Sequence, residues 1–323
     1  MAVYLGVDFG TRTVEIYQKG KGIVLREPNV AAVDSRGNVI AVGSEATLIR
    51  ARAPGTVTIR RPIVNGEVTD FNLTAEILDR CLEIVAPKQK KHVIAAVKYT
   101  LGANSREILT RALGDCRTGR VCLVDCAPAA LLGSGVTPKE SDPDDYCGSI
   151  VCDIGAGSAE ASYIRAGELL RVETASPAGD GADAAIVGLA ARKYGLALSI
   201  AAAREAKHKL SLFTGDVSSL TLAGLDKTTG MPKRITVNSA ELLQVCTPQT
   251  ESVAAALIKL LANLPHHGAS RSTADKIILT GGGALLPGIG EYLSERVGRE
   301  VTLAKDPLDC VANGLGIMLD NYK

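Results

Sequence analysis

Two short glycine-containing turns, at residues 7–13 and 151–158, constrain the fold of this chain more than any other feature. Their sequences, V-D-F-G-T-R-T and V-C-D-I-G-A-G-S, share one layout: an apolar strand, an aspartate, a glycine turn and a hydroxyl residue. A single Asp-Gly turn after a strand is usually only a hairpin turn. Glycines, however, let backbone N–H groups approach a phosphate, and an aspartate at a strand end can hold a hydrated divalent cation. The repeated layout therefore predicts two loops that grip one nucleotide from opposite sides.

Composition limits the class of protein. A chain of 323 residues is long enough for two domains of ordinary size, and 46% hydrophobic with 22% charged residues is typical of globular proteins. The net charge of +1 gives no reason to expect nucleic acid as a partner. The short basic runs at residues 88–92 and 207–209 are expected to be solvated faces.

The eight cysteines are scattered and form no C-x-x-C pair, so we expect free thiols in a reducing compartment. No apolar run approaches the roughly 20 residues of a membrane-spanning helix, and the first residues lack the pattern of a signal peptide. The sequence therefore predicts a cytoplasmic protein.

The first half of the chain begins with a predicted β meander and continues with alternating strands and helices. The meander strands are expected at residues 3–8, 14–18, 22–25, 30–34 and 39–42. Apolar spacing then predicts a helix at 74–85 with Thr74 as its cap. Further helices are expected at 105–113 and from 128, with strands at 93–97 and 121–124. This alternation predicts a mostly parallel sheet.

The second half repeats that order after a polar, proline-containing link at residues 137–146. Strands are expected at 149–153, 160–165 and 168–175, so the second half opens like the first, which indicates an internal repeat. The remaining predicted elements are helices at 182–194, 200–210, 248–264 and 288–297, and strands at 220–222, 235–237, 276–280 and 300–303. Three glycines at 281–283 follow the strand at 276–280 and suggest a backbone surface that lies flat against a base or ribose.

Several runs resemble the MreB/Mbl family of bacterial actin homologues, within the superfamily of actin, sugar kinases and DnaK. They are G-K-G-I-V-L-R-E-P-N-V (20–30), A-V-G-S-E-A (41–46), R-P-I-V-N-G-E-V-T-D-F (61–71), L-T-G-G-G-A-L-L-P-G (279–288) and D-P-L-D-C-V-A-N-G (306–314). The resemblance implies an actin-like α/β fold, with two related domains, each with a mixed, mostly parallel sheet, and a nucleotide cleft between them. Domain I is expected at 1–148 and 304–323, with a small subdomain at about 29–69, and domain II at 149–303, with one at about 181–245.

The resemblance also implies a binding site for ATP or ADP with Mg²⁺. Matching the motifs assigns nucleotide binding to Asp8, Gly10, Thr11, Arg12, Thr13, Asp153, Gly155, Ala156, Gly157, Ser158, Gly179, Asp180, Arg204, Lys207, Gly281, Gly282, Gly283 and Ala284. Within this set, Asp8 and Asp153 would hold the magnesium through water.

Departures from the family pattern affect turnover. Cys126 stands where the family places a glutamate that orients the attacking water, and a thiol cannot polarise water as a carboxylate does. Neighbouring Asp125 is a candidate substitute, and Ser158 is a further catalytic candidate. Glu160 matches a family glutamate, although a solvated strand residue is an equal interpretation. Arg204 replaces the glutamate expected three residues before Lys207. Slow or absent ATP hydrolysis is therefore expected.

By resemblance, the chain would polymerise head to tail into filaments for cell-shape control or intracellular positioning. Its partners would be further copies of itself and cell-shape or positioning proteins. The segment at 87–92 is polar and basic, so any membrane association, at the inner face, is expected to be weak or indirect. One alternative is a non-polymerising, nucleotide-dependent scaffold without turnover; another is a small-molecule kinase, which needs a carboxylate base that the sequence does not place.

Overall fold

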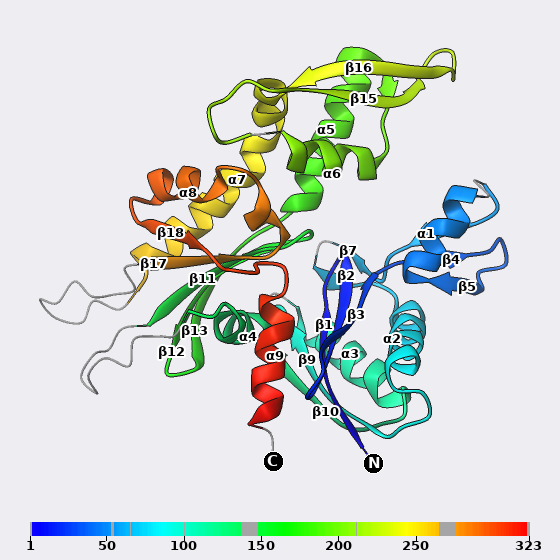
Figure 1. Ribbon diagram of the computed structural model, residues 1–323, viewed down its shortest axis with the longest axis vertical. Helices are drawn as coiled ribbons and strands as arrows, with labels where there is room; N and C mark the ends of the chain where they lie inside the picture. Colours follow the sequence, from blue (N-terminus) through cyan, green and yellow to red (C-terminus); the bar gives the residue numbers. More distant parts are fainter. Residues whose placement is uncertain are drawn as a thin grey trace, which may run out of the picture. The chain divides into compact units, whose positions relative to one another are not determined.

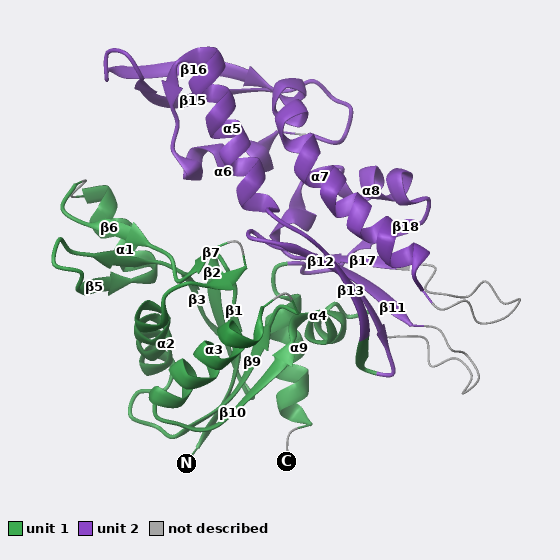
Figure 2. Ribbon diagram, turned by 180° about the vertical axis from the view of Figure 1, so that it is seen from behind, with its two compact units in different colours: residues 1–140, 167–169, 308–323 green, residues 141–166, 170–307 purple. Residues whose placement is uncertain are grey.

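The computed structural model describes residues 2–52, 55–64, 66–99, 101–136, 148–210, 212–264 and 276–321 (Figure 1). The chain divides into two compact units (Figure 2). Unit 1 comprises residues 1–140, 167–169 and 308–323, and unit 2 comprises 141–166 and 170–307. The predicted link at 137–146 lies outside the described residues. The domain and subdomain bounds implied by the resemblance stay predictions.

Unit 1 is built on a five-stranded mixed sheet with the order β10-β9-β1-β2-β3. Strands β1, β9 and β10 are parallel, whereas β2 pairs antiparallel with both β1 and β3. The carboxyl ends of β1, β9 and β10 therefore lie at one edge of the sheet. The strands are β1 (Val3–Phe9), β2 (Thr13–Gln18), β3 (Gly22–Pro28), β9 (Lys91–Val97) and β10 (Thr118–Asp125).

The two faces of this sheet are covered by different helices. Alternate residues such as Leu5, Val7 and Ile16 form an apolar core with α2 (Phe71–Val85) and α3 (Ala103–Asp115). The opposite face carries α9 (Cys310–Asp320), which lies so close that a Cβ built on Gly6 would meet the Leu315 side chain at 2.7 Å. Helix α4 (Cys126–Gly133) packs against α9 (Figures 1 and 2).

A smaller part of unit 1 forms a second sheet, with the order β5-β4-β6, and a separate two-stranded hairpin of β7 and β8. The second sheet and helix α1 enclose a small core of their own, which includes Val30, Ala32 and Ala46. Helix α1 was not predicted, because it buries only Gly43 and Ala46 and so lacks an apolar stripe. The elements are β4 (Ala31–Val33), β5 (Val39–Val42), α1 (Gly43–Arg52), β6 (Thr58–Arg60), β7 (Ile63–Val64) and β8 (Glu67–Val68).

Unit 2 repeats the main sheet of unit 1, which confirms the predicted internal repeat. Its order is β13-β12-β11-β17-β18, so β11 occupies the position of β1 and β12 that of β2. As in unit 1, the central strand pairs antiparallel with its successor and parallel with a later strand. The elements are β11 (Ser149–Ile154), β12 (Ala159–Arg165), β13 (Glu168–Ala175), β17 (Lys276–Thr280), β18 (Glu300–Leu303), α7 (Ser239–Ala262), α8 (Ile289–Val297) and the short 3₁₀ helix η1 (Gly282–Leu285).

The remaining part of unit 2 joins two helices to a three-stranded sheet with the order β14-β15-β16. Its core includes Ile186 and Ala203 from the helices and Leu222 from the sheet. These elements are α5 (Gly179–Tyr194), β14 (Leu196–Ala197), α6 (Ile200–Lys209), β15 (Ser219–Asp226) and β16 (Pro232–Asn238).

Three predicted helix starts lie three or more residues too late, and one of these helices, α5, begins at Gly179 and not at residue 182. Helix α2 is capped by Asp70, which accepts a hydrogen bond from the Leu73 N–H, whereas Thr74 is buried inside the helix. Helix α7 begins nine residues before Pro248, at Ser239, because Asn238 and Glu241 form a reciprocal capping box. Proline therefore lies inside this helix and does not start it.

The expectation of solvated basic runs was wrong at two positions. Lys91 is fully buried in β9, where its Nζ lies 2.7 Å from Glu83 Oε1, and Lys207 is buried in α6. None of the described cysteines forms a disulfide, as predicted, and all but Cys122 are buried; Cys147 lies outside the described residues.

Candidate functional site

The first glycine turn joins β1 to β2 at the edge where the parallel strands of unit 1 end. The Gly10 N–H donates to the Thr13 carbonyl at 2.9 Å, which closes a four-residue loop through Thr11 and Arg12. Asp8 lies near the end of β1, just before this loop, and is opposite Glu15 of β2 in the sheet register. A Cβ on Gly10 would lie 3.2 Å from the Thr13 carbonyl oxygen, so a side chain there would crowd the loop. Backbone N–H groups of such a loop can bind an anion.

Asn29 stabilises this turn through two hydrogen bonds, a role that was not predicted from the sequence. Its side-chain amide donates to the Gly10 carbonyl at 2.8 Å, and its backbone N–H donates to the Arg12 carbonyl at 2.8 Å. The residue is fully buried. Asn29 directly follows β3, and nothing in the sequence marks this position as functional. Through its two hydrogen bonds, Asn29 fixes the loop that carries the candidate phosphate contacts.

We expect Asn29→Ala to lower the free energy of unfolding by about 1–3 kcal/mol, because the fully buried Asn29 amide and its hydrogen bond to the Gly10 carbonyl are both lost. Urea denaturation followed by circular dichroism measures the change. Asn38→Ala is the matched control, since Asn38 is exposed and its side-chain amide donates to Asp34 of its own loop. Equal stability losses in the two variants would contradict this role for Asn29.

Asp125 and Cys126 lie at the junction of β10 and α4. Asp125 occupies the capping position of α4 without a side-chain capping bond, and its Oδ1 is 2.7 Å from Nη2 of Arg106 on α3. Its β-sheet partner is Val97, a core residue, whereas Asp8 pairs with Ala96, so alternation directs Asp8 and Asp125 to opposite faces. Cys126 is 4% exposed at the start of α4. The structure thus engages Asp125 with α3 and does not bring it to the face of Asp8.

The second turn reproduces the first in unit 2. The Gly155 N–H donates to the Ser158 carbonyl at 3.0 Å, and Asp153 pairs with Glu160 as Asp8 pairs with Glu15. Glu160 is 1% exposed, so its interpretation as a solvated strand residue was wrong. Asp153 is also buried, and Thr280 Oγ1 donates to its Oδ1 at 3.4 Å.

Helix α5 starts directly against this second turn. The Gly179 N–H donates to the Gly155 carbonyl at 3.2 Å, and the Asp180 N–H donates to the Ala156 carbonyl at 2.8 Å. The Gly157 carbonyl accepts a bond from the Ser176 hydroxyl at 3.1 Å. The predicted residues of the second loop and of the Gly-Asp pair are therefore adjacent in space.

A buried carboxylate, Asp183, joins the two predicted basic residues of α6. Lys207 Nζ lies 2.7 Å from Asp183 Oδ1, and Arg204 Nε donates to Asp183 Oδ2 at 3.0 Å. Lys207 also donates to the Gly179 carbonyl at 2.9 Å. The side chains of Asp183 and Lys207 are 1% and 4% exposed. Asp183 was not predicted from the sequence, although it lies on the same face of α5 as Gly179, one turn away.

The third glycine cluster packs against the second turn from within unit 2. Gly281 has φ +83°, and a Cβ there would lie 2.4 Å from Asp153 Oδ1. A Cβ on Gly283 would lie 2.2 Å from the Ile154 side chain, and Ala284 is buried in the core. Gly282 opens η1. Close packing on β11 is therefore sufficient to require glycine at 281 and 283.

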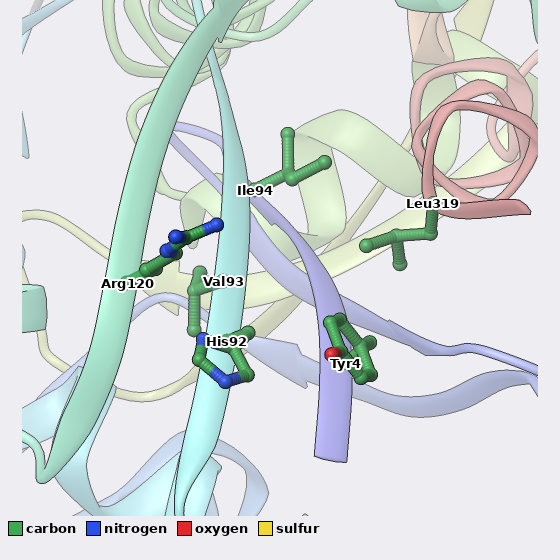
Figure 3. Close-up of a pocket in the computed structure, with 6 residues that line it drawn as sticks. All are labelled: Tyr4, His92, Val93, Ile94, Arg120 and Leu319. Carbon is green, nitrogen blue, oxygen red and sulfur yellow. The ribbon is translucent and has the colours of Figure 1, made fainter. Parts of the chain in front are cut away.

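A separate hollow in unit 1 lies at the amino ends of the parallel strands, away from Asp8 (Figure 3). It is lined by side chains that include Tyr4, His92 and Arg120, and the rings of Tyr4 and His92 stack with their centroids 5.1 Å apart. It encloses essentially no volume that a water-sized sphere can occupy, whereas typical ligand pockets have roughly 300–1,000 Å³. This hollow is therefore too small for a nucleotide.

The described residues show neither a metal cluster nor a membrane span. They contain no group of three or more His, Cys, Asp and Glu side chains arranged to hold a metal ion. No helix in the described ranges is long and apolar enough to cross a membrane.

Two α/β units that repeat one sheet, each with an Asp-Gly turn at the same strand end, define an actin-like fold. The crystal structure of MreB5 of Spiroplasma citri bound to ADP matches with a TM-score of 0.88 and 24% identity, covering 99% of this chain and 97% of that chain. The MamK double helical filament matches with a TM-score of 0.81 and 19% identity over the whole of both chains.

The chain belongs to the MreB/Mbl protein family, whose sequence model matches residues 2–323. It is 31% identical to the cell shape-determining protein Mbl of Bacillus subtilis (strain 168), over 98% of this chain and 96% of that protein. It is 32% identical to the cell shape-determining protein MreB of Escherichia coli (strain K12), over 98% and 93% of the two chains. The expected family and fold are thereby confirmed.

Proposed function

We propose that this chain is an ATP-binding cytoskeletal protein that polymerises head to tail into filaments. The observation that carries the proposal is the duplicated turn, in which Gly10 and Gly155 close equivalent loops beside Asp8 and Asp153. Duplicated loops with the same geometry are suited to bind adjacent phosphates of one nucleotide. The relative MreB5 has been solved with ADP and with AMPPNP, which supports an adenine nucleotide as the ligand.

The residues of both loops fit a nucleotide with a hydrated magnesium ion. A side chain at Gly10 would crowd the backbone of its loop, and Asp8 and Asp153 are the penultimate residues of the strands that lead into the two loops. Aspartate oxygens and waters are ligands that Mg²⁺ prefers, and the bound ion would neutralise phosphate charge. In this proposal Lys207 and Arg204, held by Asp183, supply positive charge beside Gly179.

We propose that ATP turnover is slow or absent. Cys126 is a buried thiol at the start of α4, and Asp125 is ion-paired with Arg106 on the other face of the sheet. A thiol does not polarise water as a carboxylate does, and Asp125 lies on the sheet face opposite that of Asp8. Nucleotide would then act on assembly mainly through its different affinities for two states of the subunit.

Filament formation is supported by the match to MamK, a protein solved as a double helical filament. Head-to-tail filaments form when one surface patch fits a different patch on the next copy without closing a ring. The names of the relatives Mbl and MreB support a role in cell shape. The proposed partners are further copies of this chain and cell-shape or positioning proteins, and the proposed location is the cytoplasm with weak or indirect membrane association.

A second candidate function is a non-polymerising, nucleotide-dependent scaffold. The observation that favours it is Cys126, because a protein that acts only by binding partners does not need the catalytic carboxylate.

Sedimentation of the purified chain with ATP, with ADP and without nucleotide tests the proposal, with released phosphate measured in the same tubes and pellets imaged. We expect ATP-dependent filaments and little phosphate. Tight ATP binding without a pellet under any condition would favour the scaffold, and rapid phosphate release would contradict slow turnover.

A further inference from the structure

The two turns share a longer pattern than the glycine loop itself. Residues 8–15 are D-F-G-T-R-T-V-E and residues 153–160 are D-I-G-A-G-S-A-E, so each turn carries an aspartate, a glycine, a hydroxyl and a glutamate at the same spacing. The sheet register is also the same, because Asp8 faces Glu15 and Asp153 faces Glu160. Glu15 is therefore the counterpart of Glu160 in unit 1.

The register brings Glu15 next to Asp8. Directly opposed residues of an antiparallel pair point to the same face, with Cβ atoms about 4.5–5.5 Å apart. Carboxylates that extend to one face from opposed positions favour a cation that both can reach. The pair is thus suited to a site that receives positive charge.

The environment of Glu15 leaves one of its oxygens for such a partner. The residue is 4% exposed, and its Oε1 accepts a hydrogen bond from Nε of Arg26 at 2.7 Å. Oε2 is buried and has no hydrogen-bond partner among the residues that the structure describes. Burial raises the pKa of the Glu15 carboxyl, and the neighbouring Arg26 opposes the rise. A buried carboxylate oxygen without a donor is costly, so a donor from outside the chain is favoured.

We propose that Glu15 is a positioning residue of the nucleotide site, whose Oε2 accepts a hydrogen bond from a water of the hydrated cation beside Asp8. This inference rests on the proposed nucleotide function. Arg26 fixes the carboxylate by holding Oε1, and Arg26 itself is held by Asp309 at the start of α9. No covalent step is involved, because Glu15 orients a water that the ion already binds.

The test compares nucleotide affinity with and without the metal. Dissociation constants of a fluorescent ADP analogue are measured by anisotropy on the full chain, in Mg²⁺ and in EDTA. The Kd in EDTA divided by the Kd in Mg²⁺ reports the contribution of the ion to affinity. Glu15→Gln should reduce this ratio by about tenfold, because a partner that orients a metal ligand typically contributes 10–100-fold to metal affinity. Affinity in EDTA should stay within about twofold, since the loop backbone is unchanged.

Asp309→Asn is the matched control, because it removes the other carboxylate of Arg26 and leaves Glu15 intact. We expect the ratio of the two dissociation constants in this variant to equal that of the unmodified chain. An unchanged ratio in Glu15→Gln, or the same loss in Asp309→Asn, would overturn the proposal, since either result assigns Glu15 only to the ion pair.

Two further measurements separate the possible failures. Thermal unfolding without nucleotide shows whether Glu15→Gln is folded; if it is not, Glu15→Asp replaces it and should retain part of the ratio because a carboxylate remains. An Asp variant that is folded and keeps the full ratio would also overturn the assignment, since the shorter side chain moves the oxygen away. An unmodified chain that binds no nucleotide in Mg²⁺ or EDTA would refute the proposed function itself.

Discussion

Gly314→Ala should lower the free energy of unfolding by about 3 kcal/mol or more, the upper range for overpacking a well-packed interior. Helix α9 crosses α4 with backbone against backbone, and a Cβ at position 314 would lie 1.8 Å from the Ala129 carbonyl oxygen. Gly133 on α4 is equally confined, because its Cβ would lie 1.9 Å from the Cys310 carbonyl oxygen. The two helices must separate to admit even one methyl group, and urea denaturation measures the loss.

Gly114→Ala is the control for the helical preference of alanine. Gly114 is an exposed residue of α3, and a Cβ there meets nothing within 4 Å. This variant should be more stable by about 0.5–1 kcal/mol, because alanine loses less backbone entropy than glycine in a helix. Stabilisation by Gly314→Ala as well would show that α4 and α9 do not pack as closely as described.

Asp183→Ala should lower the free energy of unfolding by about 3–5 kcal/mol, as expected when one partner of a buried ion pair is removed. Lys207, only 4% exposed, would lose its carboxylate, and Arg204 would lose the same partner. Two cations would then remain beside Gly179 without compensation. Chemical denaturation at neutral pH measures the effect.

Glu205→Ala removes an acidic residue from a pair that is open to solvent. Glu205 and Lys209 are 61% and 58% exposed on α6, so this change should cost at most about 1 kcal/mol. A loss as small in Asp183→Ala would contradict the assignment of Asp183 as the counter-ion that holds Lys207.

Much of the fold was predictable because its signals are local. The strand before each turn, such as β11, is an apolar run that ends in Asp-x-Gly, and period-two and helical patterns located most other elements. Helix α9 was missed because Gly314 and Gly316, which usually indicate turns, are required there by contacts with α4 and with the Tyr17 ring. Tertiary packing, rather than a local backbone preference, requires glycine at these two positions.

The candidate site was predictable to a similar extent. The loop residues follow from the repeated motif, but Asn29 and Asp183 act through contacts with distant segments that no spacing reveals. Glu15 was in principle visible, because aligning the two turns places it opposite Glu160. The glycines at 281–283 were assigned to a ligand surface, whereas close packing on Asp153 and Ile154 also explains two of them.

The most direct test of the central claim is the stoichiometry of nucleotide binding. Calorimetric titration of the full chain with ATP and Mg²⁺, below any assembly threshold, should show one ATP per chain. Asp8→Asn and Asp153→Asn should each weaken that same binding event by about tenfold or more, because both carboxylates would hold the hydrated ion. Two independent binding events, or ATP binding that neither substitution changes, would contradict the claim that the duplicated turns serve one nucleotide.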